Sequence, residues 1–114
     1  MVPDCLFCKI ARGEIPTELL LETENLVAFN DINPEAPTHI LVVPKKHIPS
    51  LAHVEDGEQG ILGEILLALR DLAEKKGLKQ GFRVVVNTGT HGGQSVGHLH
   101  FHLLGGRSLR WPPG

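Results

Sequence analysis

Three histidines alternate with apolar residues in the stretch His98-Leu99-His100-Phe101-His102-Leu103-Leu104. Successive side chains of a β-strand point to opposite faces, so a strand here places three imidazoles on one face and apolar side chains on the other. Such alternation also occurs in ordinary half-buried strands. Three adjacent imidazoles that titrate near neutrality repel one another when charged, however, which disfavours a purely structural role. The stretch therefore predicts a sheet with a core on one face and a chemical site on the other.

The length of 114 residues fits one domain with a core of its own, and we expect a single domain over residues 1–114. The formal net charge of -2 argues against a surface for nucleic acid or for an anionic membrane, because such surfaces need clustered Lys and Arg. Residues 1–5 carry no secretory signal, and the apolar runs are too short to cross a membrane. We therefore expect a cytoplasmic protein with neither nucleic acid nor membrane as a partner.

The remaining pattern predicts a short N-terminal helix, one long helix and five strands. The short helix falls within residues 5–13, and the long helix runs from Glu58 to Lys76 with apolar residues at helical spacing. The strands are expected at residues 19–22, 26–29, 39–44, 82–87 and 98–104, the first two as a hairpin and the third buried on both faces. Strands with one long helix among them indicate an α+β domain with a five-stranded antiparallel sheet.

A glycine-rich segment, residues 88–96, leads directly into the three histidines. It is longer than the usual hairpin loop, and its glycines allow backbone N–H groups to turn inward as an anion nest. Gln94 and Ser95 offer further donors. Glycines also commonly form plain turns. The position of this segment directly before the three histidines is what favours a role in binding.

Three imidazoles on one face suit either metal ligation or nucleophilic catalysis. Alternate strand positions can present three nitrogens to a catalytic zinc. The neighbouring donor-rich segment instead favours a phosphoryl group, which a neutral imidazole nitrogen can attack to form a phosphoramidate. The flanking histidines then set the tautomer of the nucleophile or exchange protons with the substrate. His100, at the centre, is the best-placed nucleophile.

The His98–Leu104 stretch matches the pattern of the histidine triad (HIT) family, and further segments resemble its Hint branch, the histidine triad nucleotide-binding proteins. These segments are Asp31–Pro34, Ala36–His39, Pro44–Ile48, Val85–Asn87, Gly92–Val96, Leu104–Arg107 and Trp111–Gly114. The resemblance covers nearly the whole chain. It implies a single HIT domain with a HIT-like fold, in which two sheets join in a homodimer.

The resemblance also implies a purine nucleotide-binding hydrolase. Family members of this type cleave P–N linkages of AMP or GMP derivatives through a covalent nucleotidyl-histidine intermediate, which by position forms on His100. The resemblance gives the other catalytic roles to His102 and Ser95 at the phosphate or leaving group, to His39 behind the catalytic ring, and to His98 as an orienting residue. It assigns no organic cofactor.

The nucleotide-binding roles follow from the same resemblance. Asp31 holds the ribose, and the phosphate and sugar lie along Asn87, Gly93, Gln94 and Val96. Phe7, Ile10, Phe29 and Ile32 enclose the base, and Trp111 reaches the site of the partner subunit. Other interpretations stay open: the apolar residues as ordinary core, Asp31 as a turn initiator and Trp111 as a cover for exposed core.

The pair Cys5-x-x-Cys8 predicts a metal or redox site more than a structural disulfide. A structural zinc needs four ligands, and spacing alone does not choose among seven histidines. Resemblance to bacterial members with a structural zinc points to His47 and His98. Reduced thiols packed as small hydrophobes are the alternative. A thioredoxin-like pair fits less well, since no strand precedes it.

Two other functions compete with the phosphoramidase. A nucleotide-binding regulatory module holds AMP or GMP with incidental turnover, and it needs no nucleophile at His100. A dinucleoside polyphosphate hydrolase, as in the Fhit branch, needs the same triad. The Trp111–Gly114 tail and the compact length resemble Hint instead.

Overall fold

The computed structural model describes residues 4–114. Met1 to Pro3 lie outside the described residues, and with them part of the segment 1–5 in which no secretory signal is predicted. The elements in chain order are α1 (Leu6–Ala11), β1 (Leu19–Glu22), β2 (Leu26–Asn30), β3 (Thr38–Pro44), two 3-10 turns (Leu51–His53 and Asp56–Glu58), α2 (Gln59–Lys75), β4 (Phe82–Val86), α3 (Gly89–Gly92) and β5 (Phe101–Gly105).

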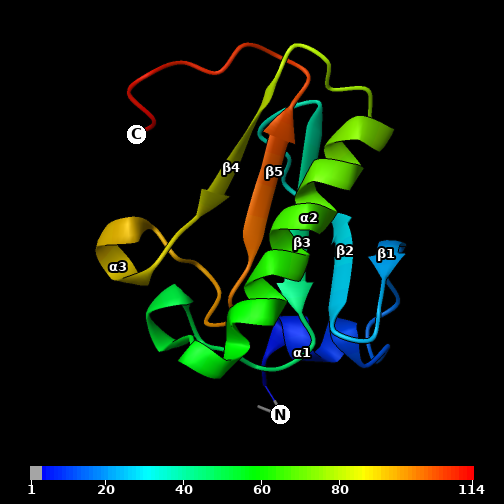
Figure 1. The fold of residues 1–114 in the computed structure, drawn as a ribbon, viewed down its shortest axis with the longest axis vertical. Coiled ribbons are helices and arrows are strands. Elements are labelled where there is room, and N and C mark those ends of the chain that lie inside the picture. Colours follow the sequence, from blue (N-terminus) through cyan, green and yellow to red (C-terminus); the bar gives the residue numbers. More distant parts are fainter. Residues whose placement is uncertain (1–3) are drawn as a thin grey trace.

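The five strands form one antiparallel sheet in the order β1-β2-β3-β5-β4 (Figure 1). This confirms the predicted α+β fold with its short and long helices. The central strand β3 is buried from His39 to Pro44, as its continuous apolar run predicts. Within residues 4–114, no helix has the length and apolar character that a bilayer span requires.

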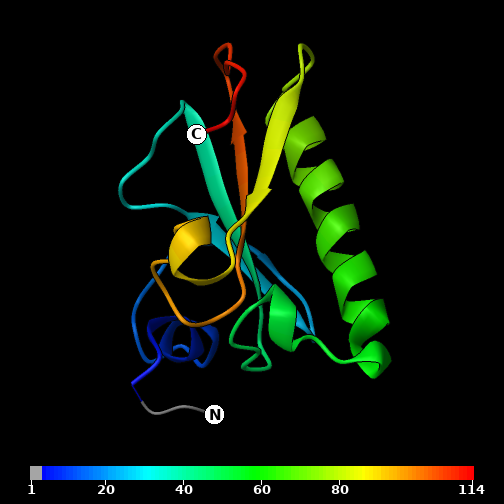
Figure 2. The ribbon, with the colours of Figure 1, turned by 90° about the vertical axis from the view of Figure 1, so that its left-hand side faces the viewer.

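The long helix α2 covers one face of the sheet, whereas α1 and α3 lie on the opposite side (Figure 2). The apolar stripe of α2, which includes Ile65 and Leu69, packs against a core that contains Leu99, Phe101 and Leu103. Burial of this stripe drives the helix onto the sheet. The apolar residues of the histidine stretch therefore face α2, and the histidines face away from it.

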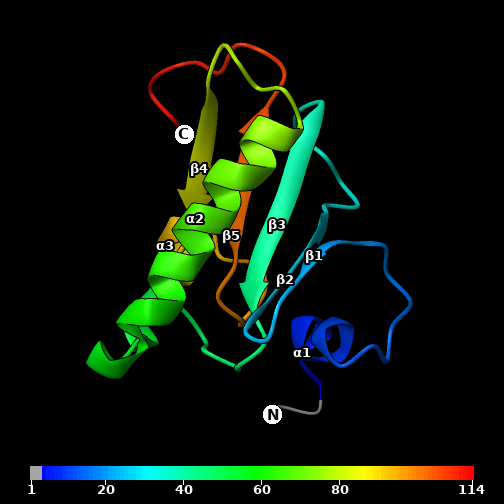
Figure 3. The same ribbon diagram turned by 45° about the vertical axis from the view of Figure 1, so that its right-hand side comes forward.

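The second core lies on the α1 side of the sheet (Figure 3). Phe7 and Ile10 of α1 pack there with Phe29 and Leu41, and Cys8 is fully buried. Cys5 caps the N-terminus of α1, because its Sγ accepts a hydrogen bond from the Cys8 N–H at 3.4 Å. A helix of six residues gains little stability from its own hydrogen bonds, so these packing contacts hold it in place.

Two local predictions are wrong. The fifth strand begins at Phe101 rather than at residue 98, because β4 ends at Val86, opposite Phe101, and leaves residues 98–100 without a ladder partner on that side. The glycine-rich segment is not all loop, since α3 forms one helical turn within it. Gly89 and Gly93 take positive φ values of 70° and 80° at the two ends of this turn, conformations that favour glycine.

Candidate active site and metal centre

A pocket of about 600 Å³ opens on the α1 side of the sheet. Its wall comes from α1, the segment before β1, the end of β2 and the residues around the histidines. Nine of the predicted site residues line it: Phe7, Ile10, Phe29, Asp31, Ile32, Ser95, Val96, His100 and His102. The pocket thus has an apolar end, formed by α1 and β2, and a polar end with two imidazoles and a carboxylate.

The other predicted residues lie around this pocket without lining it. His39 is buried and contacts His102 from behind. His98 is fully buried beneath the pocket and contacts the cysteine pair. Asn87 follows the end of β4, while Gly93 and Gln94 follow α3. Trp111 is 81% exposed near the C-terminus of this single chain.

The hydrogen bonds of His100 determine its tautomer. Its Nδ1 lies 2.7 Å from the carbonyl oxygen of His98, which can only accept, so Nδ1 carries the proton. In the neutral ring, Nε2 therefore carries the lone pair. Because His100 is 4% exposed and its ring packs edge-on to Phe7 at 5.1 Å, the ring is held by its surroundings. This arrangement provides a nucleophilic nitrogen at the pocket wall.

A chain of hydrogen bonds likewise determines the tautomer of His102. The Glu35 N–H donates to Nδ1 of His39 at 3.0 Å, so the neutral His39 ring carries its proton on Nε2. That Nε2–H donates to Nδ1 of His102 at 2.9 Å. The proton of His102 is therefore on Nε2, which is buried and has no partner among the described residues. An unpaired buried donor beside a pocket is costly unless a ligand accepts from it.

The charge state of His102 follows from the same surroundings. Burial, reinforced by the neighbouring rings of His100 and His39, lowers the pKa of His102 to about 4, against a smaller opposing effect of Asp31. The ring is therefore neutral at pH 7 and keeps Nε2–H as a hydrogen-bond donor rather than a cation.

Asp31 sits at the polar end of the pocket with its two oxygens in different roles. Oδ1 accepts a hydrogen bond from the Asn33 N–H at 2.9 Å, which fixes the turn after β2. Oδ2 lies 3.4 Å from Nε2 of His39. The turn-initiating role anticipated for Asp31 is thus present, and it coexists with a position on the pocket lining.

Gln94 braces the glycine-rich segment. Its Nε2 donates to the carbonyl oxygens of Pro49 and Val96, at 2.8 and 2.9 Å, and its Oε1 accepts from the Gly89 N–H at 3.0 Å. The backbone N–H groups of Gly93 and Gln94 close α3 by donating to Thr90 and Gly89. These donors are already used within the protein, so an anion nest in this segment would need its other N–H groups.

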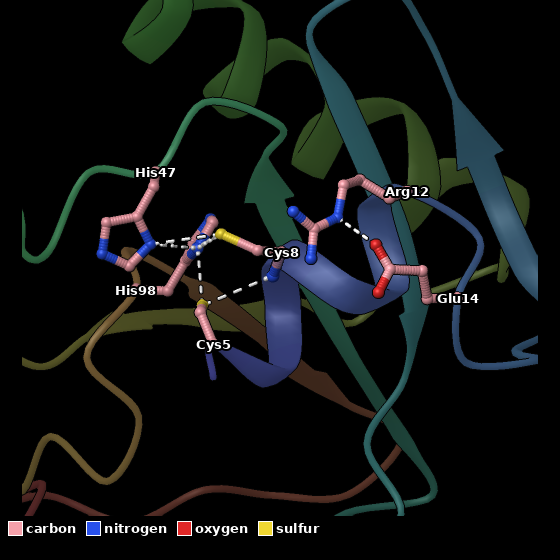
Figure 4. Close-up of polar contacts among 6 residues, drawn as sticks. All are labelled: Cys5, Cys8, Arg12, Glu14, His47 and His98. Carbon is pink, nitrogen blue, oxygen red and sulfur yellow. Dashed lines mark hydrogen bonds and ion pairs between the residues drawn. The ribbon is translucent and has the colours of Figure 1, made fainter. Parts of the chain in front are cut away.

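Four potential metal ligands meet below the pocket: Cys5, Cys8, His47 and His98 (Figure 4). Nδ1 of His98 lies 3.2 Å from Sγ of Cys5 and 3.6 Å from Sγ of Cys8, and Nδ1 of His47 lies 3.3 Å from the latter. The two imidazole nitrogens are 3.2 Å apart. Three segments far apart in sequence thus bring four donor atoms close enough to hold one metal ion.

The donor set fits zinc in kind and in spacing. Bond lengths of about 2.05 Å to nitrogen and about 2.3 Å to sulfur place tetrahedral donors roughly 3.3–3.8 Å apart, close to the observed separations. His98 is prepared as a ligand, because its Nε2–H donates to the Pro44 carbonyl at 2.8 Å and leaves the lone pair on Nδ1. Burial also lowers the pKa of His98, which keeps the ring neutral.

Sequence reasoning did not identify several residues of the pocket. Leu41 lines it from β3, and so does the segment from Ile15 to Glu18 before β1. The pairing of the strands explains the position of Leu41. It lies opposite both Phe29 and His102, so its side chain shares the face of the sheet that lines the pocket. The segment before β1 carries no such periodicity, and only the tertiary fold places it there.

Comparison with known proteins agrees with this architecture. Residues 4–109 match the family described as scavenger mRNA decapping enzyme C-terminal binding. An uncharacterized HIT-like protein of Synechococcus elongatus is 50% identical over the full length of both chains. A HIT family hydrolase from Legionella pneumophila has a TM-score of 0.95 and 51% identity, covering 97% of this chain and 100% of its own.

A histidine triad protein from Clostridium difficile is also similar, with a TM-score of 0.93 and 50% identity over 96% of each chain. The fold and the cluster of histidines thus define a protein of the histidine triad class. The chain belongs to the HIT-like family.

Proposed function

We propose that this protein is a purine nucleoside phosphoramidase of the Hint branch, which cleaves the P–N bond between a nucleoside monophosphate and an amine. The observation that carries the proposal is the tautomer of His100. The hydrogen bond from its Nδ1 to the His98 carbonyl leaves the Nε2 lone pair for attack on phosphorus. This nitrogen belongs to a ring on the wall of a pocket whose size suits a nucleotide.

In the first step, Nε2 of His100 forms a bond to phosphorus and the P–N bond to the amine breaks. The amine departs as a neutral molecule after taking one proton from solvent. The Nε2–H of His102 donates a hydrogen bond to a phosphoryl oxygen and so stabilises its charge in the transition state. Ser95, exposed at the pocket edge, contacts the phosphate or the leaving group.

In the second step, water attacks phosphorus and the bond to His100 breaks. The products are the nucleoside monophosphate and the regenerated imidazole, and water gives one proton back to solvent. His39 holds His102 in the required tautomer through both steps. A covalent route divides one difficult displacement into two easier ones.

The rest of the pocket supplies the nucleotide contacts. The apolar end, with Phe7, Ile10, Phe29 and Ile32, encloses the purine. Asp31 accepts hydrogen bonds from the ribose hydroxyls. Asn87 and the segment from Gly93 to Val96 border the phosphate and sugar, where Gln94 acts by bracing the backbone.

A structural zinc is the second part of the proposal. Cys5, Cys8, His47 and His98 would hold the ion, which would tie α1 to the sheet and take no part in the chemistry. The four donor atoms and the lone pair on Nδ1 of His98 support this assignment over two reduced thiols packed as hydrophobes.

The third part of the proposal is a homodimer in which two sheets join along β4. The free edge of β4, together with the exposed side chains of Phe82 and Val84, supports such an interface. Trp111, also exposed, would reach the site of the partner subunit and influence the choice of leaving group.

A comparison of two substrates tests the proposal. We expect the purified protein to hydrolyse adenosine 5′-phosphoramidate at least tenfold faster, in kcat/KM, than diadenosine tetraphosphate. The exposed His53 lies outside the pocket lining, so His53→Asn serves as the matched control for His100→Asn. Loss of turnover in His100→Asn alone supports the proposal, whereas a preference for the dinucleotide supports the Fhit-like alternative. AMP binding without turnover of either compound supports the regulatory module.

A further inference from the structure

His98 contributes to two sites through different atoms. Its side chain contributes Nδ1 to the cluster of four candidate ligands, where this atom lies 3.2 Å from both Sγ of Cys5 and Nδ1 of His47. Its backbone carbonyl accepts the 2.7 Å hydrogen bond from Nδ1 of His100 that sets the tautomer of that ring. One residue thus links the candidate metal ligands to His100 through its own covalent bonds and one hydrogen bond.

The backbone between these two sites is not part of the sheet ladder. The β5 strand begins only at Phe101, so residues 98–100 lack the regular pairing that fixes the rest of the strand. Two hydrogen bonds hold this segment instead: the Leu99 N–H donates to Ile48 at 2.6 Å, and Nε2–H of His98 donates to Pro44 at 2.8 Å. The burial of Leu99 in the α2 core, the Phe7 ring against His98 and the four-ligand cluster add further contacts.

A second connection runs through α1. Cys5 caps this helix and Cys8 lies within it, and their Sγ atoms contact His98 and His47, so the two thiols link α1 to both histidines. The Phe7 ring on the same helix packs edge-on to His98 and to His100, with centroids 5.9 and 5.1 Å apart. Any movement of α1 that follows loss of the ligand set therefore displaces a ring that contacts the nucleophile and lines the pocket.

We infer that His98 is a positioning residue that couples the metal centre to the active site, so that metal binding orders His100 and tightens nucleotide binding. The inference rests on the proposed function only for the role of His100 as nucleophile. Coupling between two sites is reciprocal, so a bound nucleotide must also slow loss of the metal. We expect effects on the order of tenfold in each direction.

The direct test is the tautomer of His100 in protein labelled with 15N-histidine. In zinc-loaded protein, long-range 1H–15N correlations should show a single His100 species with the proton on Nδ1. After removal of zinc with a chelator, verified by intact mass, we expect a mixture of tautomers or an exchange-broadened signal. An unchanged His100 signal in folded, stripped protein would overturn the inference.

Variants at His47 separate the metal from His98 itself. His47→Ala removes one donor and leaves His98 and His100 in place, and we expect it to reproduce the stripped signature. His47→Cys retains four donors and should restore the ordered His100 ring to the extent that it restores bound zinc. A variant that lacks zinc but keeps the ordered His100 tautomer contradicts the coupling.

A third measurement needs only the loaded protein. Transfer of zinc to an excess of a colorimetric chelator is followed with and without saturating AMP, and AMP should slow it about tenfold. An equal rate with AMP bound contradicts the coupling. If AMP does not bind the loaded protein, the proposed function fails, while the tautomer measurement on His100 still decides the coupling.

Discussion

At the scale of single residues, backbone carbonyls and N–H groups decide what each histidine can do. The Pro44 carbonyl leaves the lone pair of His98 on Nδ1, and the His98 carbonyl leaves that of His100 on Nε2. The Glu35 N–H acts through His39 to leave a proton on Nε2 of His102. These hydrogen bonds thus prepare the three rings of one sequence motif differently, and the proposed function uses them as a metal ligand, a nucleophile and a hydrogen-bond donor.

The lowered pKa of His102 predicts how stability depends on pH. This pKa is about 4 in the folded protein and about 6.5 in an unfolded chain, so between these values the unfolded state binds more protons. The contribution of His102 to the free energy of unfolding is therefore fully present above pH 6.5 and is lost as the pH falls toward 4. We expect a smaller loss over this range for His102→Asn than for wild type, measured by denaturant unfolding.

The exposed His53 provides the control, since His53→Asn should keep the wild-type pH dependence of the free energy of unfolding. Both variants are compared at the same zinc loading, because metal release at low pH affects all three proteins. If His102→Asn and wild type lose stability equally between pH 6.5 and 4, the pKa of His102 is not lowered in the folded protein.

At the scale of elements, the α2 face of the sheet carries a packed core alone, whereas the opposite face combines a second core with the candidate site. The α2 face holds an apolar core that includes the histidine-stretch residues Leu99 and Leu103, and the opposite face holds the pocket and the ligand cluster. The side chains that pack against α2 and those that line the pocket project from opposite faces of the sheet. A change on the α2 side can therefore weaken the fold without altering a group that lines the pocket.

This division predicts different effects of two leucines on α2. Leu69 is 1% exposed, so Leu69→Ala should lower the free energy of unfolding by about 2–5 kcal/mol. Leu66 is 54% exposed on the same helix, and Leu66→Ala should change it by less than about 0.5 kcal/mol. Chemical denaturation measures both. Where each variant is fully folded, its affinity for AMP, measured by calorimetry, should equal that of wild type; a weaker affinity in Leu69→Ala contradicts the division.

Some elements could be predicted from the sequence and others could not. The continuous apolar run predicted the buried β3, and helical spacing predicted α2 to within one residue at each end. The start of β5 depends on where β4 ends, and the one-turn helix α3 forms in a segment whose glycines indicate loop. The start of β5 thus depends on pairing with a distant strand, and α3 is braced by the contact of Gln94 with Pro49, so neither follows from local pattern alone.

The same limit applies to the site. The alternating histidines indicated which side chains share a face, but no sequence pattern shows that the Pro44 and His98 carbonyls would set their tautomers. Spacing indicated Cys5 and Cys8 as a metal or redox pair. His47 and His98 were assigned by family resemblance, because their proximity to the cysteines arises only from the fold.

At the scale of the whole molecule, the proposed dimer depends on the free edge of β4. Val84 is 37% exposed there, and a lysine on an edge strand opposes strand pairing with a second copy. We expect wild type and Leu66→Lys, which places the same charge on the outer surface of α2, to have twice the mass of one chain in light scattering. Val84→Lys should have the mass of one chain. A monomeric wild type, or a dimeric Val84→Lys, contradicts an interface along β4.

The covalent nucleotidyl-histidine is the central claim, and one measurement tests it directly. Zinc-loaded protein is mixed with adenosine 5′-phosphoramidate, quenched in acid-free denaturant within milliseconds, and examined by intact mass spectrometry beside His100→Asn and His53→Asn. We predict a mass gain of one adenylyl group on wild type and His53→Asn, and none on His100→Asn. Turnover of the phosphoramidate by wild type without any adduct at the shortest times, or an adduct on His100→Asn, would contradict nucleophilic catalysis by His100.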